Sequence, residues 1–377
     1  MGKEISVLFV TTNLNYNGAK KYIVEVANEL SNRGHKVGIL YDSGPLGEKL
    51  NSEVIKYNTK LFGSGLTLKS RLKLILKAAF LARSQDYKII HAESANSLVS
   101  HKLLSFISGV RVVETIHHVW SNPEERKSAA KKLNLRADKL IAISESVVRI
   151  LAEFGLDKRK VSVIQNGIDA KQYNSISKDQ VQDLQRKLGI DKKDPVVVAV
   201  SRVNKGKNFE ALVNWFPFVL SSFPTARFVI VGDNGSGDRT HVDKLIKQVK
   251  ELELSRNIIF VGGKSDVRPY LGLGNVFTIT GLARDLSVME AMATGLPVVV
   301  SKLKYPSKLE LVKDGETGLL FKWGDWQKWA EEINFLLSYP EIAKKYGGAG
   351  KSRVNALFSI ERYVDDLEKV YKNVLKI

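Results

Sequence analysis

Short apolar runs rich in valine and isoleucine recur along the chain, and polar segments with helical periodicity separate them. In the first half, these runs are residues 5–11, 36–41, 88–92, 111–116, 139–144 and 161–166. Between the first two runs, Ile23, Val26, Ala27 and Leu30 repeat at helical spacing, and Gly34 follows as a C-terminal cap. A strand, a helix and a strand within about thirty residues form a βαβ unit. We therefore predict a parallel sheet.

The second half of the chain repeats this plan. Its candidate strands are residues 195–201, 227–232, 257–262, 275–280, 297–301 and 317–321. Their nearly continuous Val and Ile content is typical of strands that are covered on both faces. The polar stretch 167–194 is the best candidate for a domain boundary. The pattern predicts an α/β fold with two doubly wound, Rossmann-like domains, whose ligand binds in a cleft at the carboxyl ends of the strands.

Composition agrees with a globular protein of two domains and removes several kinds of chemistry. The 377 residues are 44% hydrophobic and 26% charged, and they include no cysteine, so disulfides and thiol nucleophiles are excluded. The first residues, MGKEISVLFVTTN, lack the apolar core and cleavage site of a signal peptide. No run of about 18 apolar residues is present, so we expect a cytoplasmic protein.

The net charge of +18 needs an explanation. A nucleic acid, an anionic membrane surface and a phosphorylated substrate each fit such an excess of bases, and plain solubilisation is the simpler alternative. No helix-turn-helix pattern or alternation of aromatic and basic residues is present. We therefore expect no nucleic-acid partner.

Several residues with relevant chemistry follow predicted strands, where a doubly wound fold binds its ligand. Gly18 precedes the first helix and lets backbone N–H groups approach an anion, although many such turns need a glycine for geometry alone. Arg202 and Lys207 follow the strand 195–201 and suit a diphosphate, unless they are ordinary solvated bases. His117 follows the strand 111–116, and no set of residues has the spacing of metal ligands.

A helix predicted after residue 285 carries one carboxylate in an otherwise apolar sequence. Leu286 and Ser287 open this helix, whose N-terminus favours an anion. Glu290 lies about one turn inside it, where it could accept two hydrogen bonds from the vicinal hydroxyls of a ribose. A pairing of Glu290 with a nearby lysine or with capping N–H groups is the structural alternative.

These residues belong to a longer series of motifs that resembles one enzyme family. The motifs NGAKKYIVEVANELSNRGHKV, HAESA, ETIHH, ISES, VIQNGID, SRVNKGKN, FVIVGDNG, EAMATGLPVVVS and VKDGETGLLF occur in the family's order over essentially the whole chain. The sequence is thereby similar to the retaining glycosyltransferases of family 4, also called glycosyl transferases group 1, which have the GT-B fold. The resemblance implies an acceptor-side domain over 1–175, a nucleotide-sugar-binding domain over 176–357, and a helix over 358–377 that packs back on the first domain.

The resemblance also implies roles for individual residues. Arg202 and Lys207 match the pair that neutralises the donor pyrophosphate, and Glu290 matches the ribose-binding glutamate. Gly18 matches the glycine of the flexible loop near the phosphates, and His117 matches the histidine near the donor sugar and acceptor. The donor-binding set is completed by Lys264, where the family's backbone meets the base, and by Arg284, Leu286 and Ser287.

The reaction implied is transfer of a sugar from a UDP- or GDP-linked donor with retention of configuration, without a bound metal or other cofactor. The sequence departs from the family at two positions. Leu282 replaces a glutamate that usually contacts the donor sugar, and Glu93 stands where histidine is common. An active enzyme of polysaccharide or glycolipid synthesis is the main hypothesis. The alternative is an impaired GT-B subunit that binds nucleotide-sugar without turnover.

The segment 66–84 predicts an amphipathic helix with a basic face. Lys69, Lys73 and Lys77 repeat every four residues, and Arg71 adds a further base. Leu68, Leu72, Ile75 and Ala79 are expected to form a separate apolar stripe that faces the sheet. The basic face suits an anionic membrane, where each base contributes on the order of 1 kcal/mol, although an ordinary solvent face is the alternative. Membrane contact would suit a lipid-linked acceptor.

Overall fold

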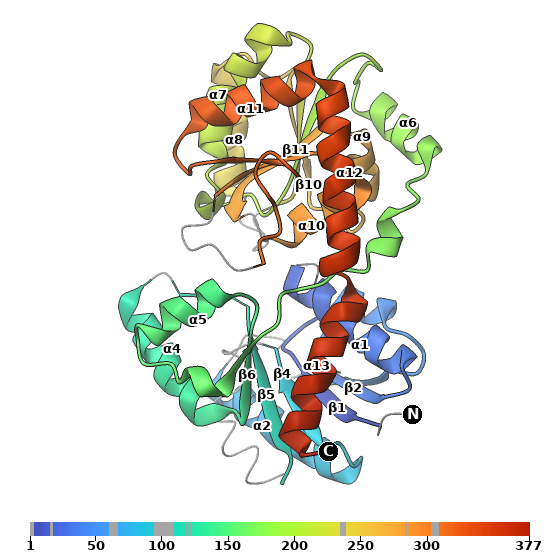
Figure 1. Cartoon of the computed structure of the whole chain (residues 1–377), viewed down its shortest axis with the longest axis vertical. Coiled ribbons are helices and arrows are strands. Elements are labelled where there is room, and N and C mark those ends of the chain that lie inside the picture. The colour runs from blue at the N-terminus through green and yellow to red at the C-terminus, as the bar shows by residue number, and fades with distance from the viewer. Residues whose placement is uncertain are drawn as a thin grey trace. The chain divides into compact units, whose positions relative to one another are not determined.

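The computed structural model describes residues 4–15, 18–59, 67–93, 109–117, 119–120, 122–233, 239–282, 285–302 and 309–377. The chain divides into two compact units (Figure 1). The N-terminal unit comprises Met1–Ile168 and Ile360–Ile377, and the C-terminal unit comprises Asp169–Ser359. The division points lie seven residues before the expected boundary at 175 and two residues after the expected boundary at 357.

The N-terminal unit is built on a seven-stranded parallel sheet in the order β3-β2-β1-β4-β5-β6-β7. All six strands predicted in this half are present, with their ends shifted by up to three residues. The strands are β1 Ser6–Val10, β2 Lys36–Tyr41, β3 Ile55–Asn58, β4 Ile89–Ala92, β5 Arg111–Ile116, β6 Lys139–Ala142 and β7 Val161–Val163. The helices are α1 Gly18–Asn32, α2 Leu68–Ser84, α4 Pro123–Arg136, α5 Glu145–Ala152 and α13 Ile360–Leu375, and Pro45–Lys49 and Lys158–Lys160 form the 3₁₀ helices η1 and η2.

Both faces of this sheet are covered, as continuous apolar strands require. On one face, Val7, Phe9 and Ile89 pack with apolar residues of α1 and α13. On the other face, Leu8, Val10 and Ile90 pack with α2. The helices α1 and α13 lie side by side (Figure 1), so a segment from the end of the chain completes the core of the first unit.

The C-terminal unit has a six-stranded parallel sheet in the order β10-β9-β8-β11-β12-β13. Its six strands are also those predicted, again with small shifts at their ends. They are β8 Val196–Val200, β9 Arg227–Val231, β10 Ile258–Gly262, β11 Val276–Leu282, β12 Val298–Ser301 and β13 Leu319–Phe321. The helices are α6 Lys178–Lys187, α7 Phe209–Ser222, α8 Thr240–Glu251, α9 Arg268–Leu273, α10 Leu286–Thr294, α11 Trp326–Ser338 and α12 Pro340–Leu357, with the 3₁₀ helices η3 Ala170–Tyr173 and η4 Lys205–Lys207.

Aromatic side chains fill the core of the C-terminal unit on one face of its sheet. Phe216 of α7 and Trp329 of α11 both pack against Phe228 of β9, with ring centroids 5.3 and 6.4 Å from it. The Trp329 ring is fully buried, and its Nε1–H donates a 2.8 Å hydrogen bond to the Thr278 hydroxyl on β11. A buried indole N–H thus has the partner that it needs. Two parallel-sheet α/β units of the doubly wound kind confirm the predicted fold class.

The strand β3 is missing from the prediction. Its residues Ile55–Asn58 are exposed or half-buried, because β3 lies at the edge of the sheet and pairs only with β2. Such a strand has no continuous apolar run for sequence reasoning to detect. Among the described residues, none of the helices is both long enough and apolar enough to cross a bilayer.

Candidate functional site

In the C-terminal unit, the strand order reverses between β8 and β11, and doubly wound sheets bind ligands at the carboxyl ends of the strands at such a switch point. Arg202 and Lys207 follow β8, and Leu286 and Ser287 open α10 after β11. These predicted residues therefore flank the switch point. Lys264 follows β10, two strands away from β8. Arg284 lies outside the described residues.

Lys207 is held at the switch point through both its side chain and its main chain. Its Nζ lies 2.5 Å from Oδ2 of Asp285, the residue that caps α10. The Thr280 hydroxyl on β11 donates a hydrogen bond to the Lys207 carbonyl oxygen. The next residue, Asn208, has the left-handed φ of 42° and leads directly into α7. Lys207 is partly buried at 22% side-chain exposure, whereas Arg202 and Lys264 are exposed.

The first turn of α10 adds a second source of positive potential at this switch point. The Asp285 carbonyl accepts the N–H groups of Val288 and Met289, and its side chain makes no capping hydrogen bond to the helix. The N–H groups at the start of a helix have no intrahelical partner, and together with the helix dipole they favour an anion. Lys207 and the start of α10 therefore lie side by side and are joined by Asp285, whose carboxylate pairs with the lysine.

Glu290 is buried in α10 and bonded within its own unit. It is 5% exposed, and its Oε1 accepts a 2.7 Å hydrogen bond from the hydroxyl of Tyr173, at the end of η3. Sequence reasoning did not find Tyr173, because 117 positions separate the two residues and no local pattern links them. The ribose-binding role of Glu290 stays a prediction. Tyr173 is one of the residues that hold this carboxylate in place.

Close backbone packing fixes the loops after β8 and β9 at the carboxyl edge of the C-terminal sheet. Gly232, at the end of β9, has a φ of 146°, and a Cβ there would lie 1.9 Å from the carbonyl oxygen of Ser201. Only glycine allows the loops after β8 and β9 to approach this closely. The motif FVIVGDNG, which contributed to the family resemblance, therefore has a structural reason for its first glycine.

In the N-terminal unit, the switch point lies between β1 and β4. Thr11, Glu93 and His117 each follow the last residue of a strand, and the three strands β1, β4 and β5 are neighbours in the sheet. His117 Nε2 lies 2.6 Å from Glu93 Oε2. Lys20, in the first turn of α1, donates from Nζ to the Thr11 hydroxyl. Gly18 is the exposed first residue of α1, whereas the prediction placed it immediately before the helix.

The carboxylate of Glu93 is the centre of this cluster. It is 2% exposed, and its Oε1 lies 3.4 Å from Nε2 of His91. Burial alone would raise the pKa of Glu93, but His91, His117 and Lys20 outweigh burial and lower it. Burial also lowers the pKa of Lys20. Sequence reasoning noted Glu93 only as a departure from the family, whereas the structure gives it partners on both sides.

The helix α2 forms as predicted, but its apolar residues divide differently. Ile75 and Ala79 are buried against the sheet, whereas Leu72 is 47% exposed, so its assignment to the buried stripe is wrong. Leu76 and Phe80, at 47% and 69% exposure, continue the exposed row that Leu72 begins. The residues Leu72, Leu76 and Phe80 are here called the α2 stripe. The side chain of Leu68 lies outside the described part.

The predicted bases of α2 surround this stripe. Lys69 and Lys73 are exposed, and Arg71 and Lys77 are half-buried. Lys77 Nζ lies 3.5 Å from the carbonyl oxygen of Asn58, which is a marginal contact. The exposed surface of α2 therefore combines apolar and basic side chains.

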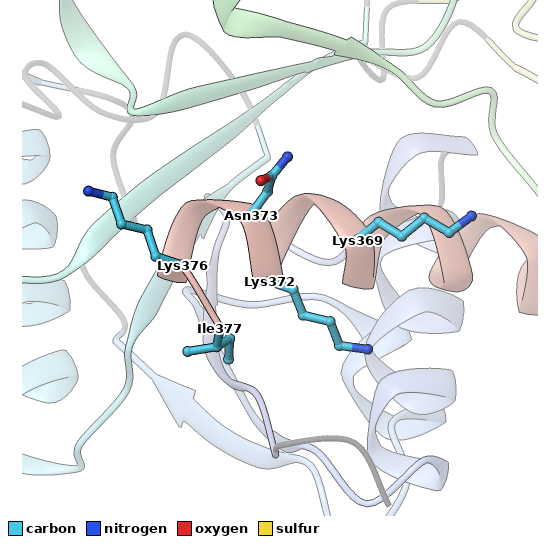
Figure 2. A pocket seen from close by; sticks show the side chains of 5 residues that line it. All are labelled: Lys369, Lys372, Asn373, Lys376 and Ile377. Carbon is cyan, nitrogen blue, oxygen red and sulfur yellow. The ribbon is translucent and has the colours of Figure 1, made fainter.

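A shallow hollow beside the end of α13 is lined by Lys369, Lys372, Asn373, Lys376 and Ile377, and Figure 2 shows its lysines pointing in different directions. Lys369 pairs with Asp366 at 2.8 Å, and Lys372 pairs with Glu368 at 3.1 Å. Glu368 also contacts His35, which immediately precedes β2. This hollow therefore belongs to the amino edge of the sheet, away from the loops that carry the candidate site.

Two family models match the chain in succession. The model described as Glycosyltransferase Family 4 matches residues 16–172, and the model described as Glycosyl transferases group 1 matches residues 180–353. Together with the two doubly wound units, these matches place the protein among the GT-B glycosyltransferases. The chain belongs to the family 4, group 1 type of these enzymes, and it is a glycosyltransferase.

Two curated relatives are similar over nearly their full length. The N-acetyl-alpha-D-glucosaminyl L-malate synthase of Bacillus anthracis is 22% identical over 374 residues, 93% of each chain. The UDP-Gal:alpha-D-GlcNAc-diphosphoundecaprenol alpha-1,3-galactosyltransferase of Escherichia coli is 26% identical over 350 residues, 88% of this chain and 87% of the relative. Among solved structures, Anabaena HepE in complex with UDP-glucose superposes with a TM-score of 0.83 at 21% identity, covering 97% of this chain and 99% of HepE.

Proposed function

We propose that this glycosyltransferase moves a sugar from a UDP- or GDP-linked donor to a lipid-linked or polysaccharide-precursor acceptor, with retention of configuration and without a bound metal. One observation carries the proposal: Lys207 and the N-terminus of α10 meet at the switch point of the C-terminal unit, with exposed Arg202 on the same strand end. A diphosphate is the ligand whose charge and shape suit this combination. The complex of HepE with UDP-glucose and the UDP-galactose donor of the Escherichia coli relative support the same donor class.

The proposed chemistry follows from where charge develops. When the bond between the anomeric carbon and the donor phosphate breaks, negative charge grows on the departing nucleoside diphosphate. Lys207 and Arg202 would stabilise this charge together with the first N–H groups of α10, because preorganised groups of this kind need no rearrangement during the reaction. Glu290, held by Tyr173, would bind the ribose. His117 would act near the donor sugar and acceptor.

Asp285 forms an ion pair with Lys207. This ion pair keeps the ammonium group beside the start of α10 and prevents it from extending into solvent. A dianionic diphosphate can outcompete a single carboxylate for the lysine, so Asp285 would serve as the partner that prepares Lys207 for its ligand.

Leu282, which replaces the family's usual glutamate, lies at the end of β11, where its backbone pairs with Ser301.

The experiment is an activity screen of the purified protein with UDP- and GDP-sugars and with polyprenyl-phosphate-linked and glycolipid acceptors. We expect transfer from one donor class, an α-linked product from an α-linked donor by proton NMR, and full activity in excess EDTA. A product of inverted configuration would refute retention, and loss of activity in EDTA that Mg²⁺ restores would refute metal independence. Donor binding by calorimetry without transfer to any acceptor would instead identify the impaired binding subunit.

The exposed surface of α2 supports an anionic membrane as the place where a lipid-linked acceptor is met. The three residues of the α2 stripe lie four positions apart, within about 80° on a helical wheel, and exposed Lys69 and Lys73 lie on the same side. Apolar side chains that enter the interface and bases that meet anionic headgroups are the two contributions to peripheral binding. We therefore expect peripheral attachment through α2.

Vesicle co-sedimentation tests this attachment. Phe80→Ser should reduce binding to phosphatidylglycerol vesicles severalfold, and 0.5 M NaCl should weaken binding of the unmodified protein, an order-of-magnitude expectation from screening. The matched control is Phe218→Ser, which removes a 41% exposed phenylalanine from α7 of the other unit. Equal binding of the Phe80 variant and the unmodified protein would refute a membrane role for the stripe.

A further inference from the structure

A chain of four side chains connects the C-terminal helix α13 to His117. Tyr371 of α13 places its hydroxyl 2.5 Å from His91 Nδ1, and His91 lies within β4. His91 Nε2 lies 2.7 Å from the Thr115 hydroxyl and 3.4 Å from Glu93 Oε1. The other oxygen of Glu93 lies 2.6 Å from His117 Nε2. His91 and Tyr371 are fully buried and Glu93 almost so.

The protonation states in this chain follow from burial. Burial lowers the pKa of His91 to about 4, so this ring is neutral near pH 7. Burial also raises the pKa of Tyr371, so its hydroxyl keeps its proton and can donate to His91 Nδ1. The single N–H of neutral His91 is then on Nε2, where Thr115 and Glu93 can accept it.

The remaining oxygen of Glu93 determines how His117 is held. An ionised carboxylate can only accept hydrogen bonds, so the Nε2 atom of His117 must carry the hydrogen that joins the two residues. In the neutral imidazole, the lone pair is then on Nδ1. The Tyr22 and His117 rings pack edge to face with their centroids 5.9 Å apart, and together these contacts restrict the His117 ring.

We propose that Glu93 is a positioning residue that fixes His117 in one orientation and one tautomer, with Nδ1 left to accept a hydrogen bond from a hydroxyl of the bound sugar substrate. Glu93 is itself held by His91, which Tyr371 fixes from α13. Lys20 supplies a compensating charge that helps to keep the buried carboxylate ionised. This inference rests on the proposed function only for the part that His117 plays in transfer.

The first test determines the tautomer of His117 by NMR. The full-length protein is labelled with ¹⁵N-histidine, and the His117 signals are assigned from a His117→Gln sample. We expect the pattern of the Nε2–H tautomer in the unmodified protein. In Glu93→Gln, whose amide can either donate or accept, we expect the His117 signals to shift towards a mixture of tautomers. An unchanged His117 pattern in Glu93→Gln would overturn the proposal.

The second test measures kcat and the donor KM of Glu93→Gln and of a matched control variant. Glu93→Gln should lower kcat by about 10–100-fold, the range seen when the partner behind a metal-binding histidine is removed, with less than a threefold change in the donor KM. The control is Glu114→Gln, which alters another fully buried carboxylate on β5, three residues before His117. The control should leave the His117 signals and kcat unchanged, whatever its melting temperature.

The outcomes separate this proposal from the proposed function. If Glu114→Gln lowers kcat as much as Glu93→Gln, the effect is structural and the positioning role is wrong. If the unmodified protein transfers no sugar while Glu93→Gln still changes the His117 tautomer, the proposed function fails and the positioning of His117 stands. If Glu93→Gln changes the His117 tautomer but leaves kcat unchanged, Glu93 positions His117 without contributing to sugar transfer. The proposed role of this positioning in catalysis is then wrong.

Discussion

At the switch point of the N-terminal unit, Lys20 and Glu93 are buried and His117 is nearly so, and each is bonded to a neighbour. At the switch point of the C-terminal unit, Lys207 keeps part of its surface and Arg202 is exposed. The same sheet topology thus carries two different electrostatic designs. The first pairs its charges among buried neighbours, so removing Lys20 should reduce folding stability. The second pairs Lys207 with the partly exposed Asp285 and leaves Arg202 exposed, so removing one of these bases should reduce ligand binding or turnover.

The largest effect is expected at Lys207. Lys207→Ala should lower kcat by about 10²–10³-fold, the range for loss of one preorganised group that stabilises transition-state charge. Thermal stability should change little, since the ion pair with Asp285 is partly exposed. Steady-state kinetics with the preferred donor gives the measurement. The control is Lys205→Ala, an exposed lysine two residues earlier in η4. A wild-type kcat in Lys207→Ala would contradict the assigned role.

The opposite result is expected at Lys20. Lys20→Met removes a buried ammonium that donates to Thr11 and interacts with Glu93. The free energy of unfolding should fall by about 1–3 kcal/mol, because a hydrogen bond to a charged group is lost and its partners stay buried. Urea denaturation measures this change. Lys21→Met, which alters a neighbour that is 30% exposed and 4.0 Å from Glu25, should cost less than about 0.5 kcal/mol. Equal losses in the two variants would remove the contrast between the two switch points.

A smaller effect on binding is expected at Glu290. Glu290→Ala should weaken nucleoside diphosphate binding by about tenfold, since a hydrogen bond to a charged group contributes about 1.5–3 kcal/mol and water replaces part of it. Isothermal titration calorimetry with UDP and GDP gives the affinity. Tyr173→Phe keeps the carboxylate and removes the hydroxyl that holds it, so its loss of affinity should be smaller. Unchanged affinity in Glu290→Ala would refute the ribose contact.

The smallest effect is expected from acid titration of Glu368 on α13. Burial would raise the pKa of Glu368, but hydrogen bonds from Arg33, Lys372 and His35 outweigh burial and lower it below its ordinary value of 4.5. The stability that these contacts provide is therefore complete above pH 4.5 and is lost as the pH falls through the lower pKa of the folded protein.

Unfolding of Glu368→Gln as a function of pH measures this contribution. The variant should be about 1 kcal/mol less stable than the unmodified protein at pH 7, and the difference should shrink as the solution becomes more acidic. Asp366→Asn is the control, because Asp366 lies on the same helix but pairs only with exposed Lys369 among the contacts described. A difference that grows in acid would contradict the direction of the Glu368 pKa shift.

The hydrophobic pattern was sufficient to predict twelve strands and the doubly wound arrangement, because buried parallel strands are nearly continuous runs of Val and Ile. The edge strand β3 was not predicted, because its residues Ile55–Asn58 lack such a run. On α2, the periodicity identified a helix correctly but assigned Leu72 to the wrong side. Helical spacing shows which residues share a face, and it does not show which of two adjacent apolar rows the sheet covers.

Candidate site residues could be placed from the sequence because each follows a predicted strand end. Arg202, Lys207 and His117 all lie at the carboxyl edges of their sheets. Their partners could not be predicted in the same way. Tyr173 reaches Glu290 and Tyr371 reaches His91 across 117 and 280 positions, and only the folded chain brings such residues together.

The last helix, α13, belongs to the N-terminal unit, and this has a consequence for the synthesis of the protein. The N-terminal unit is assembled from Met1–Ile168 and Ile360–Ile377, with all of Asp169–Ser359 between them. During translation, the ribosome must complete the whole second unit before Tyr363, Leu367 and Tyr371 emerge to close the first hydrophobic core. Until then, the apolar surface of the first unit that α13 covers stays exposed, and such exposed surface makes an incompletely folded chain prone to aggregation.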